Sequence, residues 1–135
     1  MKTVQTDKAP TPIGPYSQAV VVERFIFCAG QVGVDPKTEK LASGIEKQAK
    51  QTLKNIQAVV EAAGSDMEHV IKTTIYLKDV NDFAKVNEIY ATFFSSHKPA
   101  RATVGVADLP KEALVEIEAV ALLENKACAC GSYEC

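Results

Sequence analysis

The chain has 135 residues, a formal net charge of −2 and no run of lysines or arginines. This length suits one domain around one core, and the composition is typical of a soluble globular protein. The weakly acidic charge disfavours nucleic acid as a partner. No apolar run is long enough to cross a membrane, so we expect a cytoplasmic location without a membrane partner.

The N-terminal part is predicted to form a hairpin. Residues 1–13 are largely polar and contain prolines, which predicts an extended or mobile lead-in. Gly14-Pro15 is a turn signal ahead of a first strand over residues 17–22, and a second strand is predicted over residues 25–30. The second strand is apolar on both of its alternating faces, which is typical of a strand covered on both sides.

Two helices and a further strand are predicted for the middle of the chain. Ser43 and Glu46 have capping-box spacing ahead of a helix over residues 44–63, whose apolar residues recur every three or four positions. A run rich in β-branched residues predicts a strand over residues 70–77. A second amphipathic helix is predicted over residues 82–95.

The chain is predicted to end with strands over residues 102–106 and 114–124. The order of elements favours an α+β fold in which both helices pack on one face of a mixed sheet. Strands 25–30 and 114–124 are apolar on both faces, and no further helix is available to cover the second face. We therefore expect a partner subunit to cover that face, in a homo-oligomer.

Arg101 is the first candidate for a functional residue. It is one of only two arginines, with Arg24, in a chain that otherwise uses lysine. Arginine holds a planar carboxylate or phosphate through two parallel hydrogen bonds, which lysine does poorly. Arg101 also follows Pro99 and precedes a predicted strand, so its backbone entry is partly fixed. An anion clamp and a surface salt bridge remain equal alternatives on this evidence.

The four cysteines fall into two groups. Cys28 lies in an apolar run and is expected to be a small buried residue. Cys128, Cys130 and Cys135 crowd residues 125–135, which we predict to be a flexible tail after a single domain over residues 1–124. Exposed thiols are the favoured interpretation of the tail. A metal site is the alternative, but a closed zinc site needs four ligands and a framework.

Five segments occur in order along the chain: GPYSQA, FCAGQVGVDP, KTTIYLKDVNDFAKVNEIY, PARATVGVADLP and VEIEAVA. Together they closely resemble the RidA (YjgF-like) family of imine deaminases, from about Met1 to Leu123. The resemblance implies a chorismate-mutase-like α+β fold and a homotrimer with ligand sites between subunits. It also implies hydrolysis of 2-imino or 2-enamino acids to 2-keto acids and ammonia, without a bound cofactor or metal.

The same resemblance implies roles for individual residues. Arg101 would hold the substrate carboxylate, and Glu118, the second glutamate of VEIEA, would position the hydrolytic water. Tyr16 would supply an aromatic hydroxyl. Backbone groups near Gly30 would position the substrate, and Asn87 would line or brace the cleft.

Two positions depart from a common form of the family pattern. Ala29 stands where many relatives have serine, and Thr103 stands where some have cysteine. Both positions remain candidate substrate-binding positions. We expect the loss of the serine hydroxyl at Ala29 to alter rate or preference rather than to abolish activity.

Each of these residues also has a structural interpretation. Without the resemblance, Glu118 is more simply a solvated or salt-bridged glutamate, and Tyr16 an interface residue. At the level of function, a non-enzymatic trimer that binds small carboxylates through Arg101 is one alternative. Translation inhibition or ribonuclease activity is another, although the acidic charge weighs against it.

Overall fold

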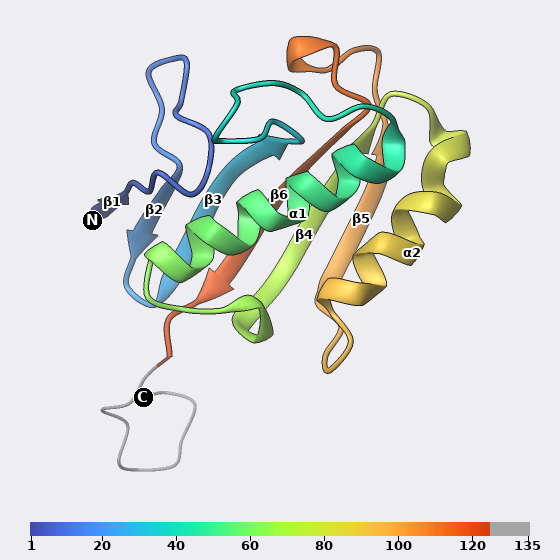
Figure 1. Ribbon diagram of the computed structural model, residues 1–135. Coiled ribbons are helices and arrows are strands. Elements are labelled where there is room, and N and C mark those ends of the chain that lie inside the picture. The colour runs from blue at the N-terminus through green and yellow to red at the C-terminus, as the bar shows by residue number, and fades with distance from the viewer. Residues whose placement is uncertain (125–135) are drawn as a thin grey trace.

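The computed structural model describes residues 1–124 as a six-stranded sheet with two helices on one face (Figure 1). The sheet order is β1-β2-β3-β6-β4-β5, and only the β4–β5 pair is parallel. This arrangement confirms the predicted α+β class. The strands are β1 (Lys2–Val4), β2 (Ala19–Val22), β3 (Phe25–Val32), β4 (Val70–Leu77), β5 (Ala100–Gly105) and β6 (Val115–Leu122).

Both predicted helices are present, with small differences at their ends. The long helix α1 spans Ile45–Ala62 and buries an apolar stripe against the sheet, while α2 spans Phe83–Phe93. The predicted capping box is wrong, because the residue that caps α1 is Gly44 and no side chain caps it. Gly44 has φ of 87°, a left-handed conformation that glycine tolerates best, and this turn places Ser43 ahead of the cap position.

The lead-in is held more firmly than its composition indicates. Lys2–Val4 forms the edge strand β1 against β2. The buried side chain of Gln18 then fixes the segment that follows. Its amide oxygen accepts from the Thr6 backbone N–H at 2.7 Å, and its amide nitrogen donates to the carbonyl of Pro10 at 2.9 Å. Of the two predicted alternatives, the extended lead-in is found in β1, and one buried amide supplies hydrogen bonds to the segment that follows.

The hydrophobic core lies between the sheet and the helices. Along β6, burial alternates residue by residue, with Ile117 and Ala119 facing the helices and Glu116 and Glu118 facing the other side. Strand β3 alternates in the same way until a bulge after Cys28, and burial raises the pKa of the Cys28 thiol to about 12. The predicted alternation of both strands is confirmed.

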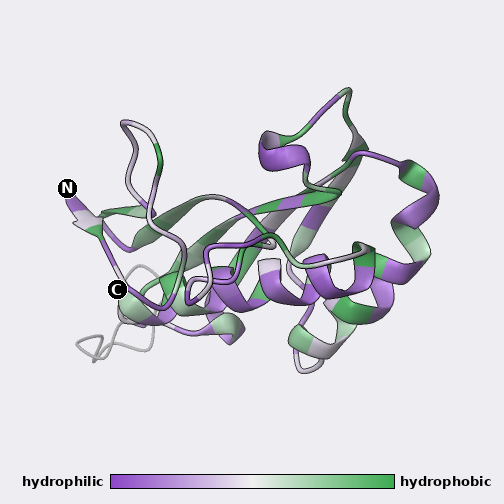
Figure 2. Cartoon of the chain, turned by 45° about the horizontal axis from the view of Figure 1, so that its top comes forward, coloured by the Kyte–Doolittle hydropathy of each residue, from purple (hydrophilic) through white to green (hydrophobic). Residues whose placement is uncertain are grey.

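The second face of the sheet carries exposed apolar side chains. Phe25 and Phe27 are 43% and 48% exposed, and their rings lie 6.1 Å apart. Val104 on β5 is also exposed on this side, and Figure 2 shows hydrophobic residues along these strands. Large apolar surface of this kind usually marks an interaction site. The expected partner subunit remains a prediction.

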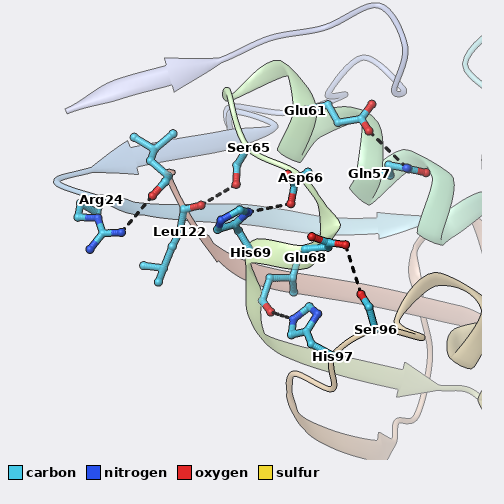
Figure 3. Close-up of polar contacts among 12 residues, drawn as sticks. Arg24, Gln57, Glu61, Ser65, Asp66, Glu68, His69, Ser96, His97 and Leu122 are labelled. Carbon is cyan, nitrogen blue, oxygen red and sulfur yellow. Dashed lines mark hydrogen bonds and ion pairs between the residues drawn. The ribbon is translucent and has the colours of Figure 1, made fainter. Parts of the chain in front are cut away.

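Polar contacts hold the C-terminal end of β6, close to where the described chain ends (Figure 3). Ser65 Oγ donates to the carbonyl of Leu122 at 2.6 Å, and Arg24 Nη2 donates to the carbonyl of Leu123 at 3.3 Å. Arg24 therefore has a structural contact. The tail cysteines and their predicted flexibility lie outside the described residues. Within residues 1–124, neither helix has the length and apolar character that a membrane crossing requires.

Candidate functional site

Arg101 lies within β5, one residue after the strand begins, rather than ahead of it as predicted. Its register partner on β4 is Thr73, which is buried on the helix side, so Arg101 also projects toward α2. The guanidinium carbon lies 4.9 Å from the ring centroid of Tyr90 and 5.5 Å from that of Phe83. Both are distances at which a cation is attracted to an aromatic face.

The side chains around Arg101 leave its charge available to a ligand. Among residues 1–124 it forms no ion pair, so the surface salt bridge considered for it is not seen in this part of the chain. A hydrogen bond holds the Tyr90 ring in place against the Arg101 guanidinium, because the Tyr90 hydroxyl lies 2.7 Å from Thr73 Oγ1. A guanidinium that is oriented by aromatic rings and carries no partner is well suited to bind a carboxylate.

A cavity of about 560 Å³ opens beside this side chain. We call it the Arg101 pocket, and it is lined by Asn87, Tyr90, Ala91, Phe94, Lys98, Pro99 and Arg101. Thr103 shares the face of β5 with Arg101, and its buried hydroxyl has no hydrogen-bond partner within the described chain. Of the predicted residues, Arg101 and Asn87 therefore line the same pocket, with Thr103 two residues along the strand.

A second cavity, of about 460 Å³, is lined by three of the other predicted residues. We call it the Glu116 pocket. It lies between the lead-in, the end of β3 and the start of β6, and Tyr16, Ala29 and Gly30 line it as predicted candidates. Much of the remaining wall is apolar and includes Pro10, Ile13, Val32, Val34 and Pro110.

Glu116 is the carboxylate of this pocket, and the sequence interpretation missed it. It lies against Gly30 so closely that a Cβ atom at position 30 would overlap its carboxylate. The bulge in β3 between Cys28 and Gln31 lies beside this approach. Burial, and secondarily the negative charge of Glu118, raises the pKa of Glu116 above its ordinary value. A carboxyl group whose protonated form is favoured in this way can serve as a general acid and, once ionised, as a general base.

Glu118, the predicted water-positioning residue, does not line either pocket. It follows Glu116 on the same face of β6, and the Tyr76 hydroxyl donates a short hydrogen bond to it. That bond is the main reason why the pKa of Tyr76 is raised. Alternation along a strand gives both glutamates the same face, so the sequence pattern alone does not distinguish them. The position of Gly30 on the neighbouring strand distinguishes them, because Glu116 is the glutamate that lies against it.

The two pockets are separate in a single chain. Thr73 pairs with Arg101, whereas Tyr76 pairs with Glu116, and these two residues of β4 face opposite sides of the sheet. Arg101 and Asn87 are thus brought together, and so are Tyr16, Ala29 and Gly30, but the two sets are not joined. Among residues 1–124, no cluster of three His, Cys, Asp or Glu side chains is arranged to hold a metal ion.

The sequence and the fold place the chain in a known class of small proteins. The sequence model of the family described as Endoribonuclease L-PSP matches residues 6–123. The chain therefore belongs to the endoribonuclease L-PSP family, which includes proteins called YjgF and RidA. The crystal structure of the YjgF gene product of E. coli superposes with a TM-score of 0.88 at 46% identity, covering 92% of this chain and 100% of that one.

Individual relatives carry more specific names. A RutC family protein of Pyrococcus horikoshii is 53% identical over 124 residues, covering 91% of this chain and 98% of its own length. A human 2-iminobutanoate/2-iminopropanoate deaminase is 52% identical over 122 residues, covering 90% of this chain and 89% of its own length. The structure of E. coli TdcF with bound serine has a TM-score of 0.89 at 41% identity, covering 92% and 100% of the two chains.

Proposed function

We propose that this protein hydrolyses 2-imino acids, and their 2-enamino tautomers, to 2-keto acids and ammonia. Similarity to relatives named 2-iminobutanoate/2-iminopropanoate deaminase in human and in Salmonella typhimurium, at 52% and 48% identity, supports this activity. The observation that carries the proposal is the pair of complementary half-sites. One presents a guanidinium without an ion-pair partner in the described chain, and the other presents a carboxyl group whose pKa is raised.

Arg101 has the role of substrate anchor in this proposal. A 2-imino acid carries a planar carboxylate, which the two parallel N–H groups of a guanidinium can bind. The Tyr90 and Phe83 rings limit the positions that the guanidinium can adopt. Asn87 lines the same pocket, and Thr103 stays a candidate position two residues along β5.

Glu116, rather than Glu118, has the role of general acid and base. Its carboxyl proton passes to the imine nitrogen, and water then attacks the carbon while giving a proton to the Glu116 carboxylate. A second transfer to nitrogen produces the leaving ammonia, and the hydroxyl proton returns to Glu116 as the carbonyl forms. Water supplies both hydrogens that nitrogen gains, so the enzyme is regenerated. Tyr16 and backbone groups near Gly30 orient the water and the substrate in this pocket.

The site is completed between subunits of a homotrimer. Arg101 and Glu116 occupy opposite faces of one sheet, so a substrate that meets both must contact two chains. The apolar face around Phe25 and Phe27 offers the surface on which such subunits pack. A closed ring of identical subunits repeats the same mixed site at each interface.

A coupled assay tests the activity directly. An amino-acid oxidase or a serine/threonine dehydratase generates 2-imino acids in the cuvette, and release of ammonia or of the keto acid is followed with and without the protein. We expect release to accelerate in proportion to the protein added. A rate equal to the uncatalysed rate across 2-iminopropanoate and 2-iminobutanoate would remove the proposal.

A second candidate function is binding of small carboxylates without turnover. The solved structure of TdcF with bound serine favours it, because that relative holds a small amino acid. The same Arg101 pocket would serve both functions. Saturable binding of a keto acid by calorimetry, combined with no acceleration of imine hydrolysis, would favour this alternative. Salt-sensitive binding of RNA would instead favour the ribonuclease activity that the family description names.

A further inference from the structure

The contact between Tyr76 and Glu118 is not used by the mechanism above. Tyr76 lies on β4 directly opposite Glu116 in the antiparallel register, and Glu118 lies opposite Thr74. The Tyr76 hydroxyl nevertheless bonds to Glu118, so its side chain reaches diagonally past Glu116. Three polar side chains thus form a contiguous group on the face of the sheet that bears the Glu116 pocket.

The two carboxylates of this group have different surroundings. Glu118 accepts a hydrogen bond from the Tyr76 phenol, which fixes the position of its carboxylate. Glu116 is affected by burial and by the charge of Glu118, both of which favour its protonated form. The hydrogen bond from Tyr76 therefore decides where the charge that acts on Glu116 is placed.

We propose that Tyr76 and Glu118 are positioning residues that favour the protonated form of Glu116. The Tyr76 hydroxyl holds the Glu118 carboxylate in place, and the negative charge of that carboxylate, two residues away on the same face, disfavours ionisation of Glu116. The inference rests on the proposed function for its catalytic consequence. Neither residue touches the substrate, and both act only through Glu116.

The groups that face Glu116 from the surrounding elements are few. Glu118 comes from its own strand and Tyr76 from β4, while Tyr16 and the exposed Lys111 come from the loops that line the pocket. Strand β3 contributes Gly30 and no charged side chain to this face. Glu118 is the only carboxylate among these neighbours, so it is the one whose removal relieves repulsion at Glu116.

Glu118→Gln and Tyr76→Phe test the inference in the intact oligomer. The Glu118→Gln substitution removes the negative charge, so Glu116 should lose its proton at lower pH. The limb of the kcat/KM profile that reports Glu116 should then move to lower pH, by about 0.5–1 unit. The Tyr76→Phe substitution removes only the hydroxyl, so the Glu118 carboxylate is no longer held beside Glu116. The kcat should fall by about threefold or more while KM stays unchanged.

Glu61→Gln is the matched control, because Glu61 is an exposed carboxylate on α1 away from both pockets. It should leave the profile and kcat unchanged. A wild-type profile in both Glu118→Gln and Tyr76→Phe would overturn the inference. So would a loss of thermal stability in Tyr76→Phe without any change in kcat, because that result assigns the contact a purely structural role.

Carboxyl-carbon NMR titration separates this inference from the proposed function. It measures the pKa of Glu116 in the wild type and in Glu118→Gln whether or not imines are hydrolysed. A lower pKa of Glu116 in the variant supports the positioning pair even if the wild type fails the imine assay. An unchanged pKa overturns the pair even if the wild type is an active deaminase.

Discussion

Arg101 and Glu116 lie on opposite faces of one sheet, and β4 separates the strands that carry them. Arg101 contacts the rings of α2, whereas Glu116 meets Gly30 on the side that the helices leave open. Two groups so placed act on one small substrate only if different chains supply them.

Mixed oligomers test this arrangement. Arg101→Ala and Glu116→Gln subunits, each inactive alone, are coexpressed with different tags and purified as mixed assemblies. Random mixing leaves about a quarter of the interfaces with an intact arginine and an intact glutamate, so about a quarter of wild-type activity should return. If each chain holds its own complete site, the mixture stays inactive.

Arg101→Ala should weaken substrate capture while leaving the fold intact. Two charge-assisted hydrogen bonds to a carboxylate are lost, which predicts a fall in kcat/KM of about 10²-fold or more. Arg101→Lys should recover little, because an ammonium does not reproduce the bidentate geometry. Steady-state kinetics and a thermal melt provide the measurement.

Arg24 offers the matched control for that experiment, as the other arginine of the chain. Arg24 Nη2 donates to the carbonyl of Leu123 and Arg24 lines neither pocket. Arg24→Ala should lower Tm and leave kcat/KM within about twofold of the wild type. Equal kinetic damage from both arginine variants would contradict a specific role for Arg101.

Two glycines of the same segment should respond differently to alanine. The three atoms nearest to a Cβ at Gly30 all belong to the Glu116 side chain, which can turn away. Gly30→Ala should therefore fold normally and lose about 10-fold or more in kcat. A Cβ at Gly33 would lie 2.6 Å from the backbone oxygen of Gln48 in α1. Gly33→Ala should therefore destabilise the fold by about 1–3 kcal/mol.

Chemical denaturation and the imine assay, run on both glycine variants, measure the contrast. The expected result is an activity defect in one and a stability defect in the other. A stable and fully active Gly30→Ala protein would show that the approach of Glu116 to β3 has no functional importance.

Gln18→Ala should release the lead-in. Its buried amide satisfies the Thr6 N–H and the Pro10 carbonyl, and losing it leaves backbone groups without partners, at a cost of about 1–3 kcal/mol. Because Pro10 and Ile13 line the Glu116 pocket, KM should rise as well. Hydrogen exchange over residues 5–13 should accelerate. Gln57→Ala, which removes a contact to Glu61 on the surface of α1, should change neither quantity.

Much of the fold could be predicted from the sequence, because helical and strand periodicities state which faces are buried. The stripe of α1 and the alternation of β6 illustrate this. The edge strand β1 could not, since three residues carry too little periodicity and their pairing with β2 depends on distant contacts. The capping box failed because the conformation of Gly44, and not the spacing of Ser43, decides where α1 begins.

The candidate site could be predicted only in part. Unusual residue usage identified Arg101, and the family resemblance indicated Tyr16, Gly30 and Asn87. Neither indicated that these residues would lie on two opposite faces of the sheet. The register between neighbouring strands decides which of their residues share a face, and the sequence of one strand does not state that register. The choice between Glu116 and Glu118 likewise depends on which of them meets Gly30 across the sheet.

The burial of Cys28 supplies this protein with an internal reporter. Its thiol has a pKa raised to about 12, so almost no nucleophilic thiolate exists at neutral pH while β3 remains packed under the helices. Replacing Cys128, Cys130 and Cys135 by serine leaves Cys28 as the only sulfhydryl of the chain. The rate at which a thiol reagent labels such a protein then measures how often the centre of the sheet opens, independently of any catalytic assay.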